Sequence, residues 1–300
     1  MKRHGPIGRT TATALRPAHP HEHQHRHPHH HGHGDTDVPT LPAHRHAHRS
    51  DPEALAPAIR VDNLTVSYHR HPAVHHLSCV FDVGSLTAIV GPNGAGKSSL
   101  MHALGGRLVP STGSVQLAQP QRGGLAYLPQ QSEIDRSFPL RVLDAVLLGA
   151  WRSLGLFGGA DAALQQRGHE ALAAVGLGGF ERRLVGELSV GQFQRVLFAR
   201  VMLQDAPVIL LDEPFNAIDE RTTADLMALV QRWHQEQRTV LAVLHDMELV
   251  RRSFPHTLLL AREAVAFGDT RTVLSAANLQ RARHMAEHWD EDAASCKVTA

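Results

Sequence analysis

The chain has few cysteines and no long apolar run free of charge. Its 300 residues include two cysteines, Cys79 and Cys296, which are too few for a disulfide framework and suit a reducing compartment. No apolar run approaches the roughly 18 residues needed to cross a bilayer. The longest candidates are residues 239–245 and 257–267, and charged residues interrupt the second. No apolar stretch follows the basic N-terminus, as it would in a secretory signal. These absences predict a cytosolic protein whose role at a membrane is peripheral.

The chain also lacks an excess of charge of either sign. Its formal net charge of +1 argues against a nucleic-acid binder that depends on bulk positive charge. Histidine, in contrast, is concentrated: 12 of the 24 histidines lie between His19 and His48, among prolines and with almost no large apolar side chains. Such a segment buries too little apolar surface to offset its ordering entropy, so residues 1–57 are predicted to be disordered. About 240 residues remain, ample for a sizeable core.

From Ala58 onward, short apolar runs alternate with helical periodicity, which is typical of an α/β domain. The order of strands and helices predicts a parallel sheet. Strands are expected at 58–68, 86–90, 113–117, 125–128, 207–211 and 239–244. Helices are expected at 97–108, at several places within 141–203, at 222–237 and again beyond Thr272.

A phosphate-binding loop is the strongest motif. Residues 91–98 match G-x-x-x-x-G-K-[ST] between an expected strand and an expected helix, so backbone N–H groups and the helix N-terminus would face phosphate. Lys97 would reach the β- and γ-phosphates and Ser98 would bind Mg²⁺. A glycine turn that matches by chance is the alternative, but Lys97 is the one lysine away from the chain ends, among 27 arginines. The predicted ATP-binding set here is Gly91, Pro92, Asn93, Gly94, Ala95, Gly96, Lys97, Ser98 and Ser99.

Two adjacent acids follow the buried strand 208–211. Asp212 is placed to hold Mg²⁺ and Glu213 to orient and polarise the attacking water. An acid that caps a helix is the alternative interpretation. His245 ends the next apolar strand, where it is either a core histidine or a contact to the γ-phosphate, and the other motifs favour the second.

Residues 188–192 read Leu-Ser-Val-Gly-Gln before an amphipathic helix, and by itself this is a capping box. Between a phosphate loop and a strand that ends in Asp-Glu, it makes residues 58 to about 272 resemble the ATP-binding subunit of ABC transporters. The resemblance implies an α/β P-loop NTPase fold with a small antiparallel β subdomain and a helical subdomain at about 131–203. The predicted organisation is a histidine-rich tail (1–57), the ABC ATP-binding domain (58–272) and a helical C-terminal tail (273–300).

The resemblance also implies roles for single residues. Tyr68 matches the aromatic residue that lies against adenine, and Gln130 matches the glutamine that touches Mg²⁺ or water and relays to the permease. Asp219 matches the loop that communicates across the dimer, and His245 matches the switch histidine.

The signature segment Ser189, Val190, Gly191 and Gln192 would cap the ATP held by the opposing subunit. Val190 stands where the family usually has glycine, and a β-branched residue disfavours positive φ, so the turn must form with ordinary dihedral angles. Ile218 replaces a more usual leucine.

Residues 137–151 and 188–215 further resemble the subunits that power manganese, zinc and iron importers. This implies a homodimer that closes on two ATP molecules with Mg²⁺, two integral-membrane permease subunits, an extracytoplasmic metal-binding protein and no nucleic acid. The place implied is the cytoplasmic face of the inner membrane.

Histidines of the tail alternate with other residues in runs no longer than three, unlike an expression tag. Imidazole suits Zn²⁺, Ni²⁺, Cu²⁺ and Co²⁺ better than Mn²⁺, so the tail is either a zinc buffer or a solvated low-complexity segment. Both interpretations favour zinc over manganese as the imported ion, and the alternatives are the same role for manganese, iron(II) or nickel. The predicted Zn²⁺ ligands are His21, His23, His25, His27, His29, His30, His31 and His33.

Two other classes of protein were weighed. A histidine-rich metallochaperone NTPase also joins a phosphate loop to a metal-binding segment, but its G-domain carries Asn-Lys-x-Asp, which this sequence lacks. Soluble ABC proteins of DNA repair or translation have twin cassettes or long coiled coils, and this chain has one cassette and no sustained heptads.

Overall fold

The computed structural model describes residues 57–68, 71–117, 124–151 and 159–287. The chain divides into two units, Met1–Asp51 and Pro52–Ala300, and every described residue belongs to the second. The predictions for the histidine-rich tail, and for the last 13 residues, therefore lie outside the described residues.

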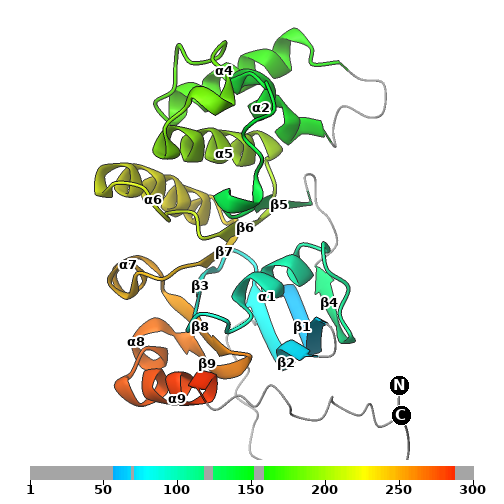
Figure 1. Cartoon of the computed structure of the whole chain (residues 1–300), viewed down its shortest axis with the longest axis vertical. Coiled ribbons are helices and arrows are strands. Elements are labelled where there is room, and N and C mark those ends of the chain that lie inside the picture. Colours follow the sequence, from blue (N-terminus) through cyan, green and yellow to red (C-terminus); the bar gives the residue numbers. More distant parts are fainter. Residues whose placement is uncertain (1–56, 69–70, 118–123, 152–158, 288–300) are drawn as a thin grey trace, which may run out of the picture. The chain divides into compact units, whose positions relative to one another are not determined.

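A six-stranded sheet forms the centre of the second unit (Figure 1). Its order is β5 (Leu125–Leu128), β6 (Val208–Asp212), β7 (Thr239–Val243), β3 (Leu86–Val90), β8 (His256–Ala261) and β9 (Glu263–Asp269). The first five strands are parallel, as expected, and β9 is antiparallel to β8. The segment 257–267, noted only as an apolar run, is thus a hairpin, and Arg262 at its turn has a φ of 64°.

The central strands β3, β6 and β7 are apolar except for Thr87, Asp212 and Thr239, because both faces of the sheet are covered. In β7, Val240 and Ala242 belong to a core cluster with the helices α5 (Val190–Gln204) and α6 (Glu220–Gln235), whereas Leu241 and Val243 belong to a second cluster with α1 (Lys97–Leu104). The second cluster also contains the inner side chains of a small antiparallel sheet. This two-sided burial explains why the strands read as continuous apolar runs in the sequence.

The small sheet has the order β2 (His71–Asp82), β1 (Pro57–Tyr68) and β4 (Thr112–Leu117), and both of its pairings are antiparallel. Sequence analysis predicted the sheet but not β2. Val74 and Leu77 are both buried although they are three residues apart, because His76 between them has a φ of 48° and breaks the alternation. The period-two pattern that marks a strand is therefore disguised.

The expected helices are present with shifted ends, and α7 (Met247–Ser253) is an addition that sequence analysis did not predict. Gly105 and Gly106 end the helix after the phosphate loop four residues before the predicted end, at Leu104. The helix of residues 220–235 begins two residues early because Asp219 accepts a hydrogen bond from the Thr222 N–H and caps it. The helices are α1 (Lys97–Leu104), α2 (Val142–Leu147), α4 (Ala162–Ala174), α5 (Val190–Gln204), α6 (Glu220–Gln235), α7 (Met247–Ser253), α8 (Thr270–Val273) and α9 (Ala276–Glu287), with 3₁₀ turns η1 (Gln131–Glu133), η2 (Leu148–Ala150) and η3 (Val185–Glu187).

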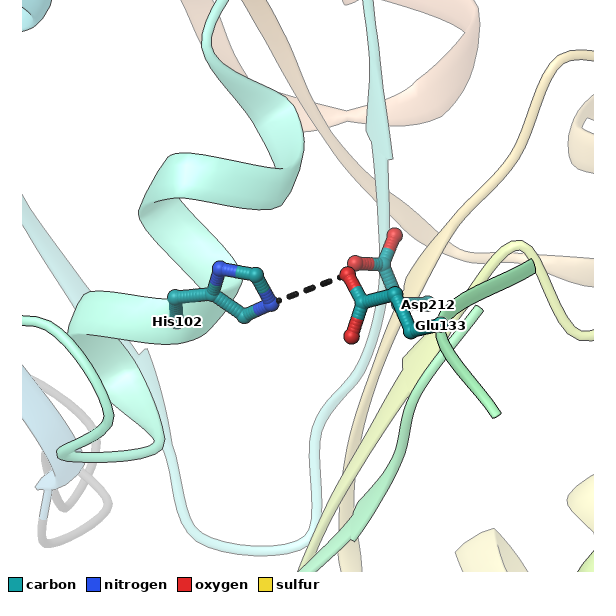
Figure 2. A group of neighbouring side chains, drawn as sticks. All are labelled: His102, Glu133 and Asp212. Atoms are coloured by element: carbon teal, nitrogen blue, oxygen red, sulfur yellow. Dashed lines mark ion pairs between the residues drawn. The ribbon is translucent and has the colours of Figure 1, made fainter. Parts of the chain in front are cut away.

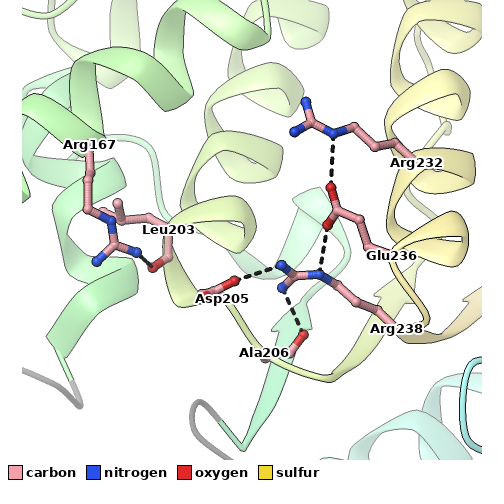
Figure 3. A network of polar contacts seen from close by, with 7 residues as sticks. All are labelled: Arg167, Leu203, Asp205, Ala206, Arg232, Glu236 and Arg238. Atoms are coloured by element: carbon pink, nitrogen blue, oxygen red, sulfur yellow. Dashed lines mark hydrogen bonds and ion pairs between the residues drawn. The ribbon is translucent and has the colours of Figure 1, made fainter.

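A polar network fixes the chain where it enters β6 and β7 (Figure 3). Arg238 pairs with Asp205 at 2.7 Å and with Glu236 at 3.1 Å, and it donates to the Ala206 carbonyl at 3.2 Å. Glu236 also pairs with Arg232 at 2.9 Å. The network holds the starts of two parallel strands side by side, so it aligns the opposite strand ends, which carry the paired acids and His245.

Within the described residues, no helix is both long and apolar enough to cross a membrane.

The aromatic stack around Phe198 joins α5 to α6 and gives a test of the core. The Phe198 ring lies 5.8 Å from that of Trp233, with 6° between their planes, and 6.2 Å from that of Phe215. Phe198→Ala should lower the free energy of unfolding by about 3–5 kcal/mol because it leaves a cavity. The control Phe138→Ala, at a side chain that is 67% exposed, should change it by less than about 0.5 kcal/mol. Urea unfolding measures both; equal midpoints for the two variants would contradict the assignment of this core.

Candidate nucleotide-binding site

The phosphate loop lies between β3 and α1 and depends on glycine at two close approaches. Gly96 has a φ of 89°, and a Cβ there would lie 2.0 Å from the Ala73 carbonyl oxygen. A Cβ at Gly91 would lie 1.9 Å from the Leu260 carbonyl oxygen. Neither position has room for a side chain, so the loop is packed against β2 and β8 while its remaining surface is left for a ligand.

Lys97 begins α1, and its ammonium group is held by the loop itself. Nζ donates to the carbonyl oxygens of Gly91 and Pro92, each at 2.9 Å. Burial lowers the pKa of the Lys97 ammonium group, whereas the carboxylates of Glu213 and Asp212 oppose that shift. The structure therefore keeps a buried cation within the loop, with neutral carbonyl partners that anionic oxygens would readily replace. Ser98 and Ser99 follow in the first turn of α1.

Asp212, the last residue of β6, is fully buried. The hydroxyl group of Tyr127 donates to its Oδ2 at 3.3 Å, and Oδ1 has no hydrogen-bond partner. Burial raises the pKa of the Asp212 carboxyl group; the bond from Tyr127 opposes this shift, and the charges of Glu213 and Glu133 add to it. A buried carboxylate with a vacant oxygen, close to a phosphate loop, has the chemistry that Mg²⁺ requires.

Glu213 is held by three side chains that come from separate segments. Gln130 donates to Oε2 at 2.7 Å, a ring nitrogen of His245 lies 2.7 Å from Oε1, and Asn216 donates to Oε2 at 3.2 Å. The backbone of Glu213 has a φ of 49°, an uncommon conformation for a residue with a side chain. The structure thus brings the three predicted catalytic residues together and adds Asn216, which sequence analysis missed.

The signature segment forms the start of α5. Ser189 accepts a hydrogen bond from the Gln192 N–H at 3.2 Å, and the Gln192 side chain accepts from the Ser189 N–H at 3.0 Å. The predicted capping box is confirmed. Val190 is the first helical residue and has no positive φ, so the departure from glycine is accommodated as expected. Asp219 lies beside this segment, since a Cβ on Gly191 would be 3.9 Å from its Oδ2.

Two glutamines connect this segment to the catalytic residues. Gln131 donates to the Val190 carbonyl at 3.2 Å and to the side chain of Gln194. Gln194, which is buried in α5, donates to the carbonyl of Pro214 at 2.7 Å, directly after Glu213. Sequence analysis named neither glutamine. A polar residue on the apolar face of the helix was the available signal for Gln194.

Tyr68 is the last residue of β1 and pairs with His71 in the ladder. The structure describes the backbone of Tyr68 but not its side chain, so the predicted contact with adenine stays a prediction.

A phosphate loop at the end of a central strand, paired acids on a neighbouring strand and a capped signature helix together define a P-loop ATPase of the ABC type. The family model described as "ABC transporter" matches residues 74–216. The chain belongs to the ABC transporter family, as its relatives also show.

The manganese transport system ATP-binding protein MntB of Bacillus subtilis (strain 168) is 35% identical over 227 residues, which cover 74% of this chain and 91% of that protein. The zinc transport system ATP-binding protein TroB of Treponema pallidum (strain Nichols) is 37% identical over 233 residues, or 76% of this chain and 88% of that protein. Among solved structures, a metal-chelate type ABC transporter in an inward-facing conformation shares 29% identity at a TM-score of 0.68, covering 76% of this chain and 90% of that one.

These findings confirm the expected fold and the expected enzyme class. The chain is an ABC ATPase, which uses ATP and Mg²⁺ and couples hydrolysis to transport. They do not support a metallochaperone GTPase.

Proposed function

We propose that this chain is the ATP-hydrolysing subunit that powers import of a divalent metal ion through a separate permease, and that the ion is zinc. The observation that carries the proposal is Glu213, held between Gln130 and His245 beside Lys97 and Asp212, in a chain similar to ATP-binding proteins of manganese and zinc transport systems. The histidine-rich tail favours zinc over manganese, and iron(II) and nickel are the other candidate cargoes.

Each residue of the site has a role that fits its surroundings. Lys97 exchanges its carbonyl partners for oxygens of the β- and γ-phosphates, on backbone N–H groups of residues 91–98. Ser98 and Asp212 hold Mg²⁺, which neutralises developing charge on the phosphates. Glu213 accepts the proton of the attacking water, and His245 contacts the γ-phosphate.

The remaining named residues act at the edges of this site. Tyr68 stacks on the adenine ring. Gln130, which is bonded to Glu213 at 2.7 Å, couples the position of the carboxylate to movement at the permease. The adjacent Gln131, which donates to the Val190 carbonyl, would pass this movement to α5, the helix that begins with the signature segment.

The signature segment and Asp219 act in a homodimer, each chain completing the ATP site of the other. Ser189 and Val190 are exposed at the start of α5 and are available to a second copy. A bacterial ABC transporter cassette solved as a dimer supports this arrangement, with 26% identity and a TM-score of 0.63 over 71% of this chain and 99% of that one.

The permease docks on the helical group of α2, α4 and α5. Two large apolar side chains in this region are exposed, Phe138 at 67% and Trp151 at 62%. Both belong to residues 137–151, the segment that resembles metal importers. The chain thus works at the cytoplasmic face of the inner membrane, and an extracytoplasmic binding protein delivers the ion to two permease subunits.

A strain that lacks this protein tests the cargo. It should fail to grow when divalent metals are chelated and should recover when zinc, but not manganese, is added back. Complementation with the unaltered chain should restore growth under chelation, whereas Glu213→Gln should not, because its rate of ATP hydrolysis is too low to power import. Recovery with manganese alone would contradict zinc as the cargo.

The tail gives a separate prediction about zinc binding. Deleting residues 1–50 should remove most of the zinc bound in a titration, and binding by the full chain should weaken as the pH falls through about 6.5, because imidazole must be neutral to bind metal. Basal ATPase activity should persist, since the catalytic residues all follow Tyr68. If the shortened chain bound as much zinc as the full one, the tail would be a solvated appendage.

A further inference from the structure

A second cluster of possible ligands lies next to the nucleotide site. His102 on α1, Glu133 in η1 and Asp212 at the end of β6 converge, and one ligand atom from each lies within 4.8 Å of the others (Figure 2). Nε2 of His102 is 3.3 Å from Oε1 of Glu133. Three elements that are far apart in the sequence thus present a nitrogen and two carboxylates to one point.

Two polar atoms of this cluster are left without a hydrogen-bond partner in the protein. Nε2 of His102 and Oδ1 of Asp212 are both buried and have no partner with hydrogen-bond geometry. Arg107 lies 3.5 Å from Oε2 of Glu133, and the other oxygen, Oε1, faces the histidine. Tyr127 occupies Oδ2 of Asp212. Buried polar atoms without a hydrogen-bond partner are costly, and a cation bound between these two atoms would satisfy both.

The donor set indicates the class of cation. One imidazole nitrogen and two carboxylate oxygens, with further positions open to water, suit Zn²⁺ and similar transition-metal ions, whereas Mg²⁺ prefers oxygen ligands alone. Ligands at Zn–N and Zn–O distances of about 2.0–2.1 Å lie roughly 3.3 Å apart in a tetrahedral site. The three ligand atoms lie within 4.8 Å of one another. Rotation of the side chains that moves each atom by about 1 Å would bring them to the spacing of a tetrahedral site.

We propose that His102, Glu133 and Asp212 form an inhibitory site for a divalent transition-metal ion, with Zn²⁺ as the best match. The inhibition rests on the proposed function, in which Asp212 serves Mg²⁺ and ATP. An ion held by His102 and Glu133 takes the Asp212 carboxylate away from that role, so hydrolysis stops. In an importer, such a site reduces ATP use when the ion accumulates on the side of the ATPase.

The binding test uses the full chain without nucleotide and compares His102→Ala and Glu133→Gln with the parent. Glu133 is exposed, so its substitution by the isosteric amide does not disturb the core. His169→Ala is the matched control, because it breaks another His–Glu pair, His169–Glu181 at 3.6 Å, that has no third ligand within the described residues.

Zn²⁺ is titrated in competition with a chromophoric chelator, so the tail contributes equally to every protein. Both site variants should bind one equivalent fewer than the parent, and the control should bind the same number. Equal stoichiometry in all four proteins would overturn the site.

The inhibition test measures ATPase activity in buffered free Zn²⁺, each variant relative to its own activity in chelator. The half-inhibitory Zn²⁺ concentration should rise at least tenfold in His102→Ala and Glu133→Gln and stay unchanged in His169→Ala. If the variants lost a zinc equivalent but kept the parental inhibition curve, the regulatory role would be overturned. If the parent hydrolysed no ATP at all, the proposed function would fail, while the zinc stoichiometry would still decide whether the metal site exists.

Discussion

Glu213→Gln should lower the rate of ATP hydrolysis by about 10²–10⁴-fold, the usual contribution of a general base, while ATP binding persists. The amide has the shape of the carboxylate. In the parent, Gln130 donates to Oε2 of Glu213 at 2.7 Å, and the amide oxygen of the variant can accept the same hydrogen bond. His245 must then present a lone pair instead of an N–H to the amide nitrogen, and neutral histidine does so by changing tautomer. The geometry therefore survives, and only the group that accepts the proton is lost.

Phosphate release measures the rate, and equilibrium dialysis with ATP measures binding. Glu248, an exposed glutamate in the first turn of α7, is not among the residues that hold Glu213, so Glu248→Gln makes the same chemical change and should hydrolyse ATP at the parental rate. Hydrolysis by Glu213→Gln at a rate close to that of the parent would show that the base is another group.

Lys97→Ala should weaken ATP binding by roughly 10–100-fold, because it removes charge-assisted hydrogen bonds worth about 1.5–3 kcal/mol to the phosphates. The same substitution should leave the chain folded. Burial lowers the pKa of the Lys97 ammonium group. In the protein without nucleotide its hydrogen-bond partners are two carbonyl oxygens of its own loop, so the substitution removes contacts within the loop.

Titration with a fluorescent ATP analogue measures the affinity, and the thermal unfolding transition checks the fold. Lys97→Arg is the informative control: it keeps the charge but replaces the compact ammonium group, which bonds to the Gly91 and Pro92 carbonyls, with a larger planar guanidinium group. It should therefore also bind ATP poorly. Parental affinity in Lys97→Ala would contradict the assignment of the phosphate loop.

The sequence was a good guide where local chemistry determines local structure. The glycines of residues 91–96, the apolar runs of β3, β6 and β7, and the capping box at Ser189 were each predicted and are each present. Each depends on interactions within a few residues or on a buried strand with a simple composition. The residues of the loop, the two acids and the switch histidine could be named because they lie at the ends of such elements.

Pattern analysis was weaker where the backbone departs from regular periods. It missed β2, where His76 at positive φ interrupts the alternation, and it saw only an apolar run where β8 and β9 turn at Arg262. Helix ends were also displaced, because Asp219 and Gly105 act through capping geometry that binary patterning does not contain.

By itself the sequence determined the class of chemistry, since the residue types that bind phosphate, hold a cation and accept a proton are fixed by their own functional groups. Only the tertiary structure decided which side chains share that chemistry. Gln194 on the Pro214 carbonyl, and His102 and Glu133 beside Asp212, are partners from segments up to 110 positions apart. The order of strands in the sheet brings these segments together. That order arises from long-range burial on both faces of β6 and β7, which no local window of sequence records.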